Sequence, residues 1–322
     1  MEILNFNSSI SNLWYGGIYM QFLYFLERLR VPGLNEIMLA VTRLGEETAF
    51  LALALVVFWC VDKRRGYFLM AVGFAGTMLN QFLKLMCRVP RPWVLDPDFT
   101  ILEQAREAAT GYSFPSGHTQ SAVGTFGSLA VTAKKRTTAA ALWLLAGLVG
   151  FSRMYIGVHT PYDVLASVAI ALALIYGLKK PMLRGDLKTG KIILAGMLLM
   201  ALALLAYVWL WHFPADMDVH NLESGMKNAC TMAGCMAGVV IVYLGERKYV
   251  NFETKAIWWA QILKVLLGLG VVLAVKEGLR APLEWAFGTY PGRAVRYFLV
   301  VLAAGLLWPM TFRWFSRLGE KE

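Results

Sequence analysis

Residues 138–178 read TAAALWLLAGLVGFSRMYIGVHTPYDVLASVAIALALIYGL, two long apolar runs joined by a short polar connection. A helix that crosses a bilayer needs about 20 mainly apolar residues. The runs Thr138–Ile156 and Val164–Leu178 approach this length and predict two consecutive spans. Ionisable side chains beside a span are costly in lipid and point to a functional site. The connection, with Arg153, His159 and Asp163, is therefore the first place to look for chemistry.

Apolar runs of the same kind continue on both sides of this pair. The chain of 322 residues is 58% hydrophobic and only 16% charged, with a mean hydropathy of +0.54. A soluble domain has about a quarter of its residues charged. Composition and runs together predict an all-α, polytopic transmembrane bundle of about nine spans. The further runs are Thr48–Val61, Tyr67–Leu85, Thr119–Ala133, Ile192–Trp211, Met226–Leu244, Ile257–Val275 and Val295–Phe312.

Basic residues follow every second run in short clusters, within a formal net charge of +10. Such clusters mark cytoplasmic connections, so the N-terminus is predicted outside and the C-terminus inside. The connections that carry the motifs described below then face outward. Because the cations are interrupted by apolar runs, nucleic acid is excluded as a partner. The clusters are Lys63–Arg65, Lys134–Arg136, Lys179–Lys188, Arg247–Lys255 and Arg313–Lys321.

The N-terminal region differs from the rest because it mixes aromatic and charged residues. Glu27, Arg28 and Arg30 would be costly at mid-bilayer, so this segment is interpreted as interfacial. The four cysteines lie in or beside apolar runs, and no basic n-region opens the chain. We expect a multi-pass protein of a bacterial plasma membrane, with its site facing the periplasm or exterior. The expected regions are 1–45 (interfacial helices), 46–190 (catalytic core) and 191–322 (a four-span extension).

Three short motifs place cations and histidines at the outward ends of the runs. Cations held together repel one another unless they share an anion, and arginine binds phosphate oxygens in a planar fork. Backbone N–H groups at a helix start also bind anions, and glycine permits close approach. The sequence therefore predicts a phosphate-binding site without a metal ion or other cofactor. Its expected ligands are Lys84, Arg91, Ser116, Gly117 and Arg153.

The two histidines of the motifs are expected to divide the chemistry. His159 and Asp163 are four residues apart, a spacing at which the carboxylate can hold one imidazole nitrogen and free the other for attack. His159 is therefore the predicted nucleophile and Asp163 the group that orients it. His118, beside the anion site, is the predicted general acid and base. Together they predict a phosphohistidine intermediate.

The motifs K-x6-RP, PSGH and SR-x5-H-x3-D, in this order, resemble the three signatures of the type 2 phosphatidic acid phosphatase superfamily. The resemblance covers about Leu44–Lys180 and implies a metal-independent phosphatase with the site residues given above. This superfamily includes lipid phosphate phosphatases, undecaprenyl pyrophosphate phosphatases, glucose-6-phosphatase and the vanadium haloperoxidases. The matching positions are Lys84, Arg91, Pro92, Pro115, Ser116, Gly117, His118, Ser152, Arg153, His159 and Asp163.

A nine-span layout is similar to that of glucose-6-phosphatase and of the sphingosine-phosphate phosphatases. Phe114 stands where glucose-6-phosphatase usually has Arg, and Gly117 where the sphingosine-phosphate group usually has Thr. The expected substrate is a lipid phosphate monoester or a lipid pyrophosphate, taken from the outer face of the membrane. Membrane lipids are the other expected partners, and the oligomeric state stays open.

Two other functions are compatible with the same residues. A lipid phosphotransferase would pass the phosphate to an acceptor other than water. A non-enzymatic lipid transport or binding protein would keep the site without using it. Beside the motif residues, Arg88 is interpreted as a helper or lid residue near the pocket. The segment with His212 and His220 matches no metal-binding spacing and is interpreted as a solvated connection.

Overall fold

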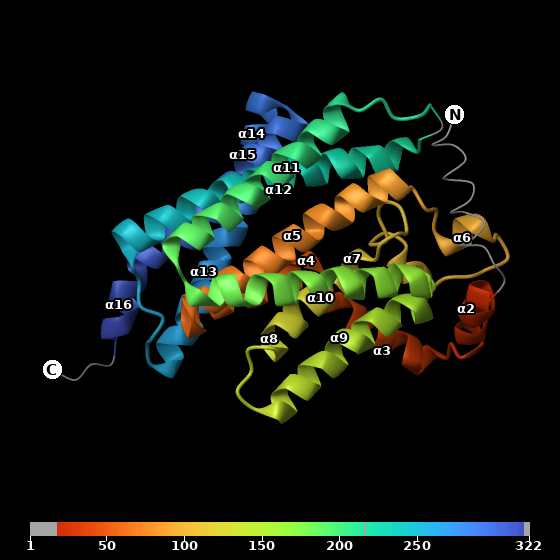
Figure 1. Cartoon of the computed structure of the whole chain (residues 1–322), viewed down its shortest axis with the longest axis horizontal. Coiled ribbons are helices and arrows are strands. Elements are labelled where there is room, and N and C mark those ends of the chain that lie inside the picture. The colour runs from red at the N-terminus through yellow and green to blue at the C-terminus, as the bar shows by residue number, and fades with distance from the viewer. Residues whose placement is uncertain (1–17, 216, 319–322) are drawn as a thin grey trace. The chain divides into compact units, whose positions relative to one another are not determined.

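The computed structural model describes residues 18–215 and 217–318, and every regular element within these ranges is a helix (Figure 1). The first seventeen residues of the expected N-terminal region lie outside the described residues. The chain divides into two compact units, each built from separated segments. Unit 1 comprises Met1–Phe50, Ala75–Gly177 and Asp216–Ser224, and unit 2 comprises Leu51–Phe74, Leu178–Ala215 and Gly225–Glu322.

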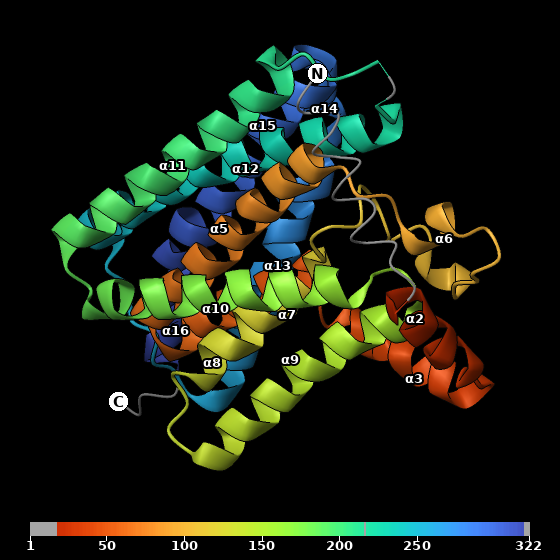
Figure 2. The ribbon, with the colours of Figure 1, turned by 45° about the vertical axis from the view of Figure 1, so that its right-hand side comes forward.

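Unit 1 contains the predicted site and is built around helix α9 (Arg136–Ile156). Helices α2 (Ile18–Arg28) and α3 (Pro32–Arg43) pack against α9, as Figures 1 and 2 both show. The other helices that lie wholly within the unit are α6 (Pro92–Leu95), α7 (Gly117–Ala122) and α8 (Ser128–Ala130). α5 (Lys63–Cys87), α10 (Pro161–Arg184) and α12 (Val219–Gly245) each contribute one end.

Local sequence explains where the helices beside the site begin and end. Pro32 occupies the start of α3, where its missing N–H costs no helical hydrogen bond. Ser116 caps α7, accepting from the Thr119 amide at 3.4 Å. Gly157 follows α9 with φ 92°, a left-handed conformation that favours glycine. The chain therefore turns sharply after α9, and His159 follows within two residues.

The N-terminal helices are tied to unit 1 by polar contacts. Arg30 donates from Nε to the Tyr155 carbonyl at 2.9 Å and from Nη1 to the Thr100 carbonyl at 2.8 Å. Its guanidinium also lies 5.5 Å from the centre of the Phe99 ring. The charged residues of this segment are thus used to bind neighbouring backbone.

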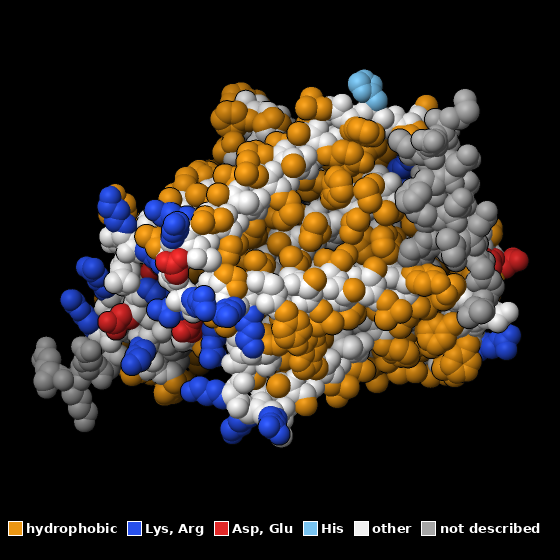
Figure 3. All heavy atoms as spheres, viewed as in Figure 1, with side chains coloured by type: hydrophobic (Ala, Val, Ile, Leu, Met, Phe, Trp, Pro, Cys, Tyr) orange, Lys and Arg blue, Asp and Glu red, His pale blue; other side chains and the backbone are white. Residues whose placement is uncertain are grey.

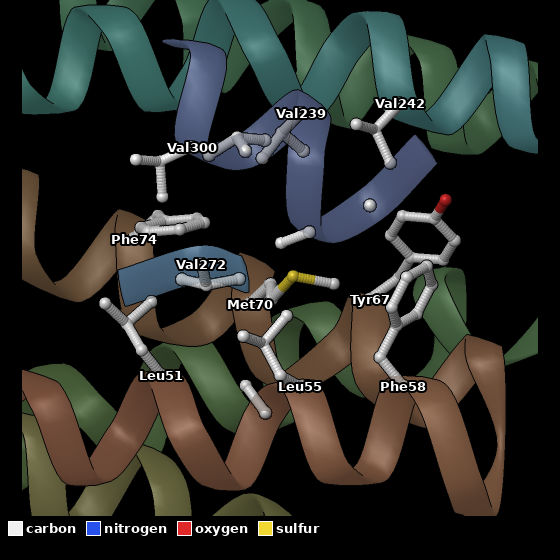
Figure 4. Close-up of a pocket in the computed structure, with 14 residues that line it drawn as sticks. Leu51, Leu55, Phe58, Tyr67, Met70, Phe74, Val239, Val242, Val272 and Val300 are labelled. Atoms are coloured by element: carbon white, nitrogen blue, oxygen red, sulfur yellow. The ribbon is translucent and has the colours of Figure 1, made fainter. Parts of the chain in front are cut away.

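Unit 2 is a helical bundle with an apolar interior. Figure 4 shows part of it, a cavity of about 80 Å³ into which Leu55, Met70 and Val272 project. The elements of this unit include α4 (Glu47–Val56) after Phe50, α11 (Leu187–Leu210), α13 (Trp258–Gly278), α14 (Arg280–Phe287), α15 (Thr289–Leu302) and α16 (Phe312–Arg317).

The predicted count of nine spans is not confirmed. Within the described residues, seven helices are long and apolar enough to cross a membrane, or eight if α3 with Glu47–Val61, bent by 53°, is one span. The run Thr119–Ala133 gives no such helix. It lies in one continuous helical stretch, residues 117–130, made of α7, a π-helical turn at Val123–Gly127 and α8, which is too short for a span. The two glycines of this turn weaken a regular helix, and Gly127 faces the Trp143 and Ile175 side chains.

Apolar side chains cover the sides of the helices, whereas cations gather at connections (Figure 3). In unit 1 they gather at the turn between α8 and α9, where Lys134, Lys135 and Arg136 lie. In unit 2 they gather around the turn between α10 and α11. The structure therefore has the surface of an integral membrane protein.

Candidate active site

Lys84 lies in the last turn of α5, and its side chain is buried. Its ammonium group donates to the carbonyl oxygen of Tyr112. Asn80, one turn earlier on the same helix, donates to the Pro115 carbonyl at 3.1 Å. The end of α5 therefore holds the loop that precedes α7.

Arg91 is 6% exposed and is held by backbone carbonyls on several sides. Nε donates to Gly111 at 3.1 Å, Nη2 to Thr110 at 2.8 Å and Nη1 to Val158 at 2.9 Å. Nη1 also lies 2.9 Å from Nε2 of His159. The planar guanidinium is thereby fixed against the imidazole ring.

Ser116, Gly117 and His118 open α7. The Ser116 amide donates to the Asp163 carbonyl at 3.2 Å, which connects α7 to α10. The turn between α3 and α4 approaches this point closely, because a Cβ on Gly45 would lie 2.7 Å from the His118 carbonyl oxygen. A side chain at position 45 would collide with this oxygen, so the contact requires glycine. The side chain of His118 itself is half-buried.

Arg153, on the last turns of α9, is 1% exposed. Its Nη1 donates to Thr42 Oγ1 at 2.7 Å, and its buried Nε has no hydrogen-bond partner among the described residues. The guanidinium therefore keeps a donor that no described protein group uses. Thr42 belongs to α3, so the expected interfacial region touches the predicted site.

His159 and Asp163 form the centre of the site. Nδ1 of His159 lies 3.3 Å from Asp163 Oδ2, which also accepts from Ser113 Oγ at 2.7 Å and from the Thr160 amide at 2.8 Å. Because the Arg91 guanidinium can only donate, Nε2 must be the nitrogen with the lone pair. The proton then sits on Nδ1 and points at the carboxylate.

Electrostatics keep this imidazole neutral. Burial lowers the pKa of His159 well below its ordinary value, and the cations Arg91, Arg153 and Lys84 lower it further. Within the described residues, no carboxylate oxygen lies within 4.0 Å of any of these three cations. The site is a neutral imidazole beside three buried cations, which outnumber the single buried carboxylate, Asp163, that lies among them.

The structure thus brings the sequence-predicted residues together within unit 1. The three cations and His118 all act electrostatically on His159. His212 is exposed and makes no hydrogen bond or ion pair within the described residues, and Asp216 of the same segment lies outside them. No group of three or more His, Cys, Asp or Glu side chains that could hold a metal ion occurs in the described part of the chain.

Three contributors were not predicted from sequence. Ser113 donates to the Asp163 oxygen that also contacts the imidazole. Thr42 accepts from Arg153, and Asn80 donates to the loop before α7. Only Asn80 carried a signal, because it is a polar residue four positions before Lys84 in an apolar helix. Ser113 and Thr42 reach the site through folding of segments that have no motif.

Comparison with known proteins gives two family matches. Residues 64–183 match the PAP2 superfamily, and residues 230–321 match the description "PAP2 superfamily phosphatase, transmembrane extension". The described active-site residues outside these ranges are few, Thr42 and Gly45 among them.

Two relatives of this chain come from Bacillus subtilis (strain 168). The chain is 33% identical to undecaprenyl-diphosphatase BcrC over 125 residues, which are 38% of this chain and 62% of that protein. It is 29% identical to phosphatidylglycerophosphatase B over 166 residues, 47% of this chain and 76% of that one. The match to the first relative therefore spans less than two thirds of its length.

A solved structure is also similar. It is described as the crystal structure of the first transmembrane PAP2 type phosphatidylglycerolphosphate phosphatase from Bacillus subtilis. The sequences are 26% identical, with 55% of this chain and 92% of that chain covered, and the TM-score is 0.41.

Proposed function

Because this chain belongs to the PAP2 superfamily, we propose that it is a membrane phosphatase that hydrolyses a lipid phosphate monoester or lipid pyrophosphate. One observation carries the proposal. The His159 imidazole lies between the Asp163 carboxylate and the Arg91 guanidinium, inside a cluster of buried cations. A neutral nitrogen nucleophile beside uncompensated positive charge fits attack on a phosphate group.

The proposed first step transfers the phosphoryl group to the enzyme. Nε2 of His159 attacks phosphorus, a P–N bond forms, and the bond from phosphorus to the leaving lipid oxygen breaks. Burial and the cations Arg153, Arg91 and Lys84 lower the pKa of His118 to about 2. His118 therefore takes up a proton together with the substrate anion, whose charge offsets these cations, and gives this proton to the leaving oxygen. Asp163 holds the Nδ1 proton of His159 and stabilises the charge that the ring acquires.

The proposed second step returns the enzyme to its starting state. His118 takes a proton from water, and the resulting hydroxide attacks phosphorus. The P–N bond breaks and inorganic phosphate leaves. Lys84, Arg91 and Arg153 stabilise the charge on the equatorial oxygens in both steps, which is the task that a metal ion performs in other phosphoryl-transfer enzymes. The proposed reaction therefore needs no metal ion.

Two observations support a lipid substrate taken from the outer face. The relatives are named for undecaprenyl diphosphate and phosphatidylglycerophosphate. The alternation of basic connections assigns the motif-bearing connections to the outside. On this basis the site faces the periplasm or exterior of a bacterial plasma membrane.

The test is phosphate release by the detergent-purified protein in the presence of EDTA. The substrates are phosphatidic acid, phosphatidylglycerol phosphate, undecaprenyl diphosphate and glucose 6-phosphate. We expect turnover of at least one lipid, abolished in His159→Ala and retained in His212→Ala, whose exposed imidazole serves as the matched control.

Each other outcome contradicts part of the proposal. Loss of activity with EDTA would contradict the metal-independent reaction. Phosphate transferred to a second lipid without release of inorganic phosphate would favour a phosphotransferase. A well-folded protein without turnover on any substrate would contradict the enzymatic function.

A further inference from the structure

A cavity of unit 1 begins at Arg91 of the site and extends away from the nucleophile. Its volume is about 540 Å³, within the range of about 300–1,000 Å³ typical of small-molecule pockets. Three segments line it, 88–94, 109–112 and 217–221. The residues that matter for its chemistry are Arg88, Arg91, Tyr112, Asp218, His220 and Asn221.

Arg91 connects this cavity to the reacting atoms. The same guanidinium that lines the cavity lies 2.9 Å from Nε2 of His159. A phosphate held at Arg91 and His159 would therefore have the group bonded to it within reach of the cavity. The volume leaves room for a polar group beyond the phosphate that is transferred.

Arg88 lines the cavity at a backbone position where the fold does not require an arginine. It follows α5 with φ 50°, a left-handed conformation that favours glycine over any branched or long side chain. Its amide still donates to the Lys84 carbonyl at 3.0 Å, as at a helix end. Its guanidinium makes no hydrogen bond or ion pair within the described residues. The backbone conformation of Arg88 costs stability, and its guanidinium has no partner among the described residues. This combination indicates that the cation binds a ligand.

The opposite wall is a pre-ordered turn before α12. Asp218 Oδ1 accepts from the Asn221 amide at 2.7 Å, which fixes the turn. The Tyr112 hydroxyl accepts hydrogen bonds from the Asp218 backbone and the Asn221 side chain, while the Tyr112 carbonyl accepts from Lys84. Tyr112 therefore links this wall to the phosphate site. Residues 217–221 lie outside both family matches.

We propose that this cavity binds the second phosphate of a lipid diphosphate, with Arg88 as its cationic ligand and residues 217–221 as the wall that selects it. The inference rests on the proposed phosphatase function and narrows its substrate class. The bond broken is then the P–O bond to the bridging oxygen, and the leaving group is a lipid monophosphate. His220 and Asn221 also line this cavity and offer hydrogen-bond donors, and Asp218 Oδ1, in the same wall, is engaged by the Asn221 amide.

The test compares a diphosphate with a monoester in the variant Arg88→Gly. Glycine suits the backbone at this position, so the variant is expected to fold at least as well as the wild type. We expect kcat/KM for undecaprenyl diphosphate to fall by roughly 10- to 100-fold, which corresponds to the loss of one charge-assisted phosphate contact. For phosphatidic acid, kcat/KM should stay within about threefold.

Arg43→Ala is the matched control, because Arg43 is an exposed cation of unit 1 outside the cavity. It should leave both substrates unaffected. Asn221→Ala, on the opposite wall, should lower turnover of the diphosphate alone, by about three- to tenfold.

Three results would overturn the inference. An equal loss on both substrates in Arg88→Gly would show that Arg88 has no selective role. If the wild type hydrolysed monoesters but no diphosphate, the proposed substrate class would be wrong, and the phosphatase function would still be supported. Absence of turnover on either substrate would overturn the phosphatase function itself, and this inference with it.

Discussion

The two compact units treat buried charge in opposite ways. In unit 2, Glu246 is 1% exposed and pairs with Lys63 at 2.7 Å. Lys264 is fully buried, donates to the Thr254 carbonyl at 3.0 Å and lies 4.5 Å from the centre of the Phe312 ring. Each of these charges has a partner that offsets its loss of water.

In unit 1, three buried cations share a single buried carboxylate. Lys84, Arg91 and Arg153 contact carbonyls and one hydroxyl, and Asp163 is committed to His159 and its neighbours. Such an arrangement weakens the fold, because the cations repel one another in a poorly solvated site. The difference indicates where to expect chemistry. Unit 2 uses the buried charges named above for structure, and we propose that unit 1 holds its buried cations for an anion.

Asp163→Asn should give the largest change. The amide can donate to Nδ1 of His159, so the proton moves to Nε2 and the attacking lone pair is lost. We expect kcat to fall on the order of 10³- to 10⁴-fold, by analogy with loss of the orienting carboxylate in a catalytic triad. Phosphate release at saturating substrate measures it. Asp186→Asn, a helix cap outside the site, is the control. Activity within tenfold of wild type would contradict the role of Asp163.

Arg153→Met tests whether a buried cation of unit 1 contributes to activity and not to stability. Turnover should fall by about 10²- to 10³-fold, because a donor to the transferred phosphate is lost. The midpoint of thermal unfolding in detergent should stay the same or rise, since an unpaired buried cation is removed. Orthovanadate should stabilise the wild type more than the variant. A large drop in the unfolding midpoint would mean that Arg153 is structural, like the charges of unit 2.

Glu246→Ala is the converse experiment in unit 2. Removing the carboxylate leaves the Lys63 ammonium without its ion pair, although Lys63 is partly exposed. We expect a loss of about 2–3 kcal/mol in the free energy of unfolding and an unchanged kcat. Denaturant unfolding and phosphate release measure the two quantities. Glu253→Ala, an exposed carboxylate, should change neither. A specific loss of turnover in well-folded Glu246→Ala would place chemistry in unit 2.

Ser113→Ala should produce a smaller effect. Asp163 Oδ2 loses one of its donors at 2.7 Å but keeps the Thr160 amide. One neutral hydrogen bond is worth about 1 kcal/mol, so kcat should fall by about fivefold with KM unchanged. Ser113→Thr should recover most of the activity. If KM alone changed, Ser113 would act on the substrate and not through Asp163.

The protonation of His159 should show no change at all over the working range. Its pKa lies well below the ordinary value because of burial and nearby cations, so the neutral form persists as pH falls. From pH 8 to 6, the ¹⁵N spectrum of labelled imidazole should show an Nδ1–H tautomer, assigned by its absence in His159→Gln. An imidazole of ordinary pKa about 6.5 would be mostly protonated at pH 6. Protonation of His159 above pH 6 would contradict the electrostatic description.

The local geometry of the motifs could be predicted from the sequence, because short spacings fix which side chains meet; the reactive roles of these residues stay a prediction. The four-residue spacing of His159 and Asp163 gives the 3.3 Å contact, and Ser116 forms the expected helix cap. The helical class and most spans followed from hydropathy, and the family membership followed from the motifs.

What the sequence could not predict depends on how distant segments meet. Thr42 reaches Arg153 only because α3 packs on α9, and Ser113 reaches Asp163 only through the path of the loop before α7. Hydropathy predicts a span at Thr119–Ala133, yet the continuous helical stretch there, residues 117–130 with a π-helical turn, is shorter than the other spans. The wall at 217–221 has no motif, and its place beside Arg91 is a property of the folded chain.

The most direct test of the central claim is to identify the residue that becomes phosphorylated. His118→Ala should form the intermediate from p-nitrophenyl phosphate, whose leaving group needs no acid, and should hydrolyse it slowly. Protein quenched in alkaline denaturant, in which the acid-labile P–N bond survives, should carry one phosphate on His159, absent when His159 is also replaced by Ala. Phosphate on another residue, or turnover without any phosphorylated protein, would contradict the proposed mechanism.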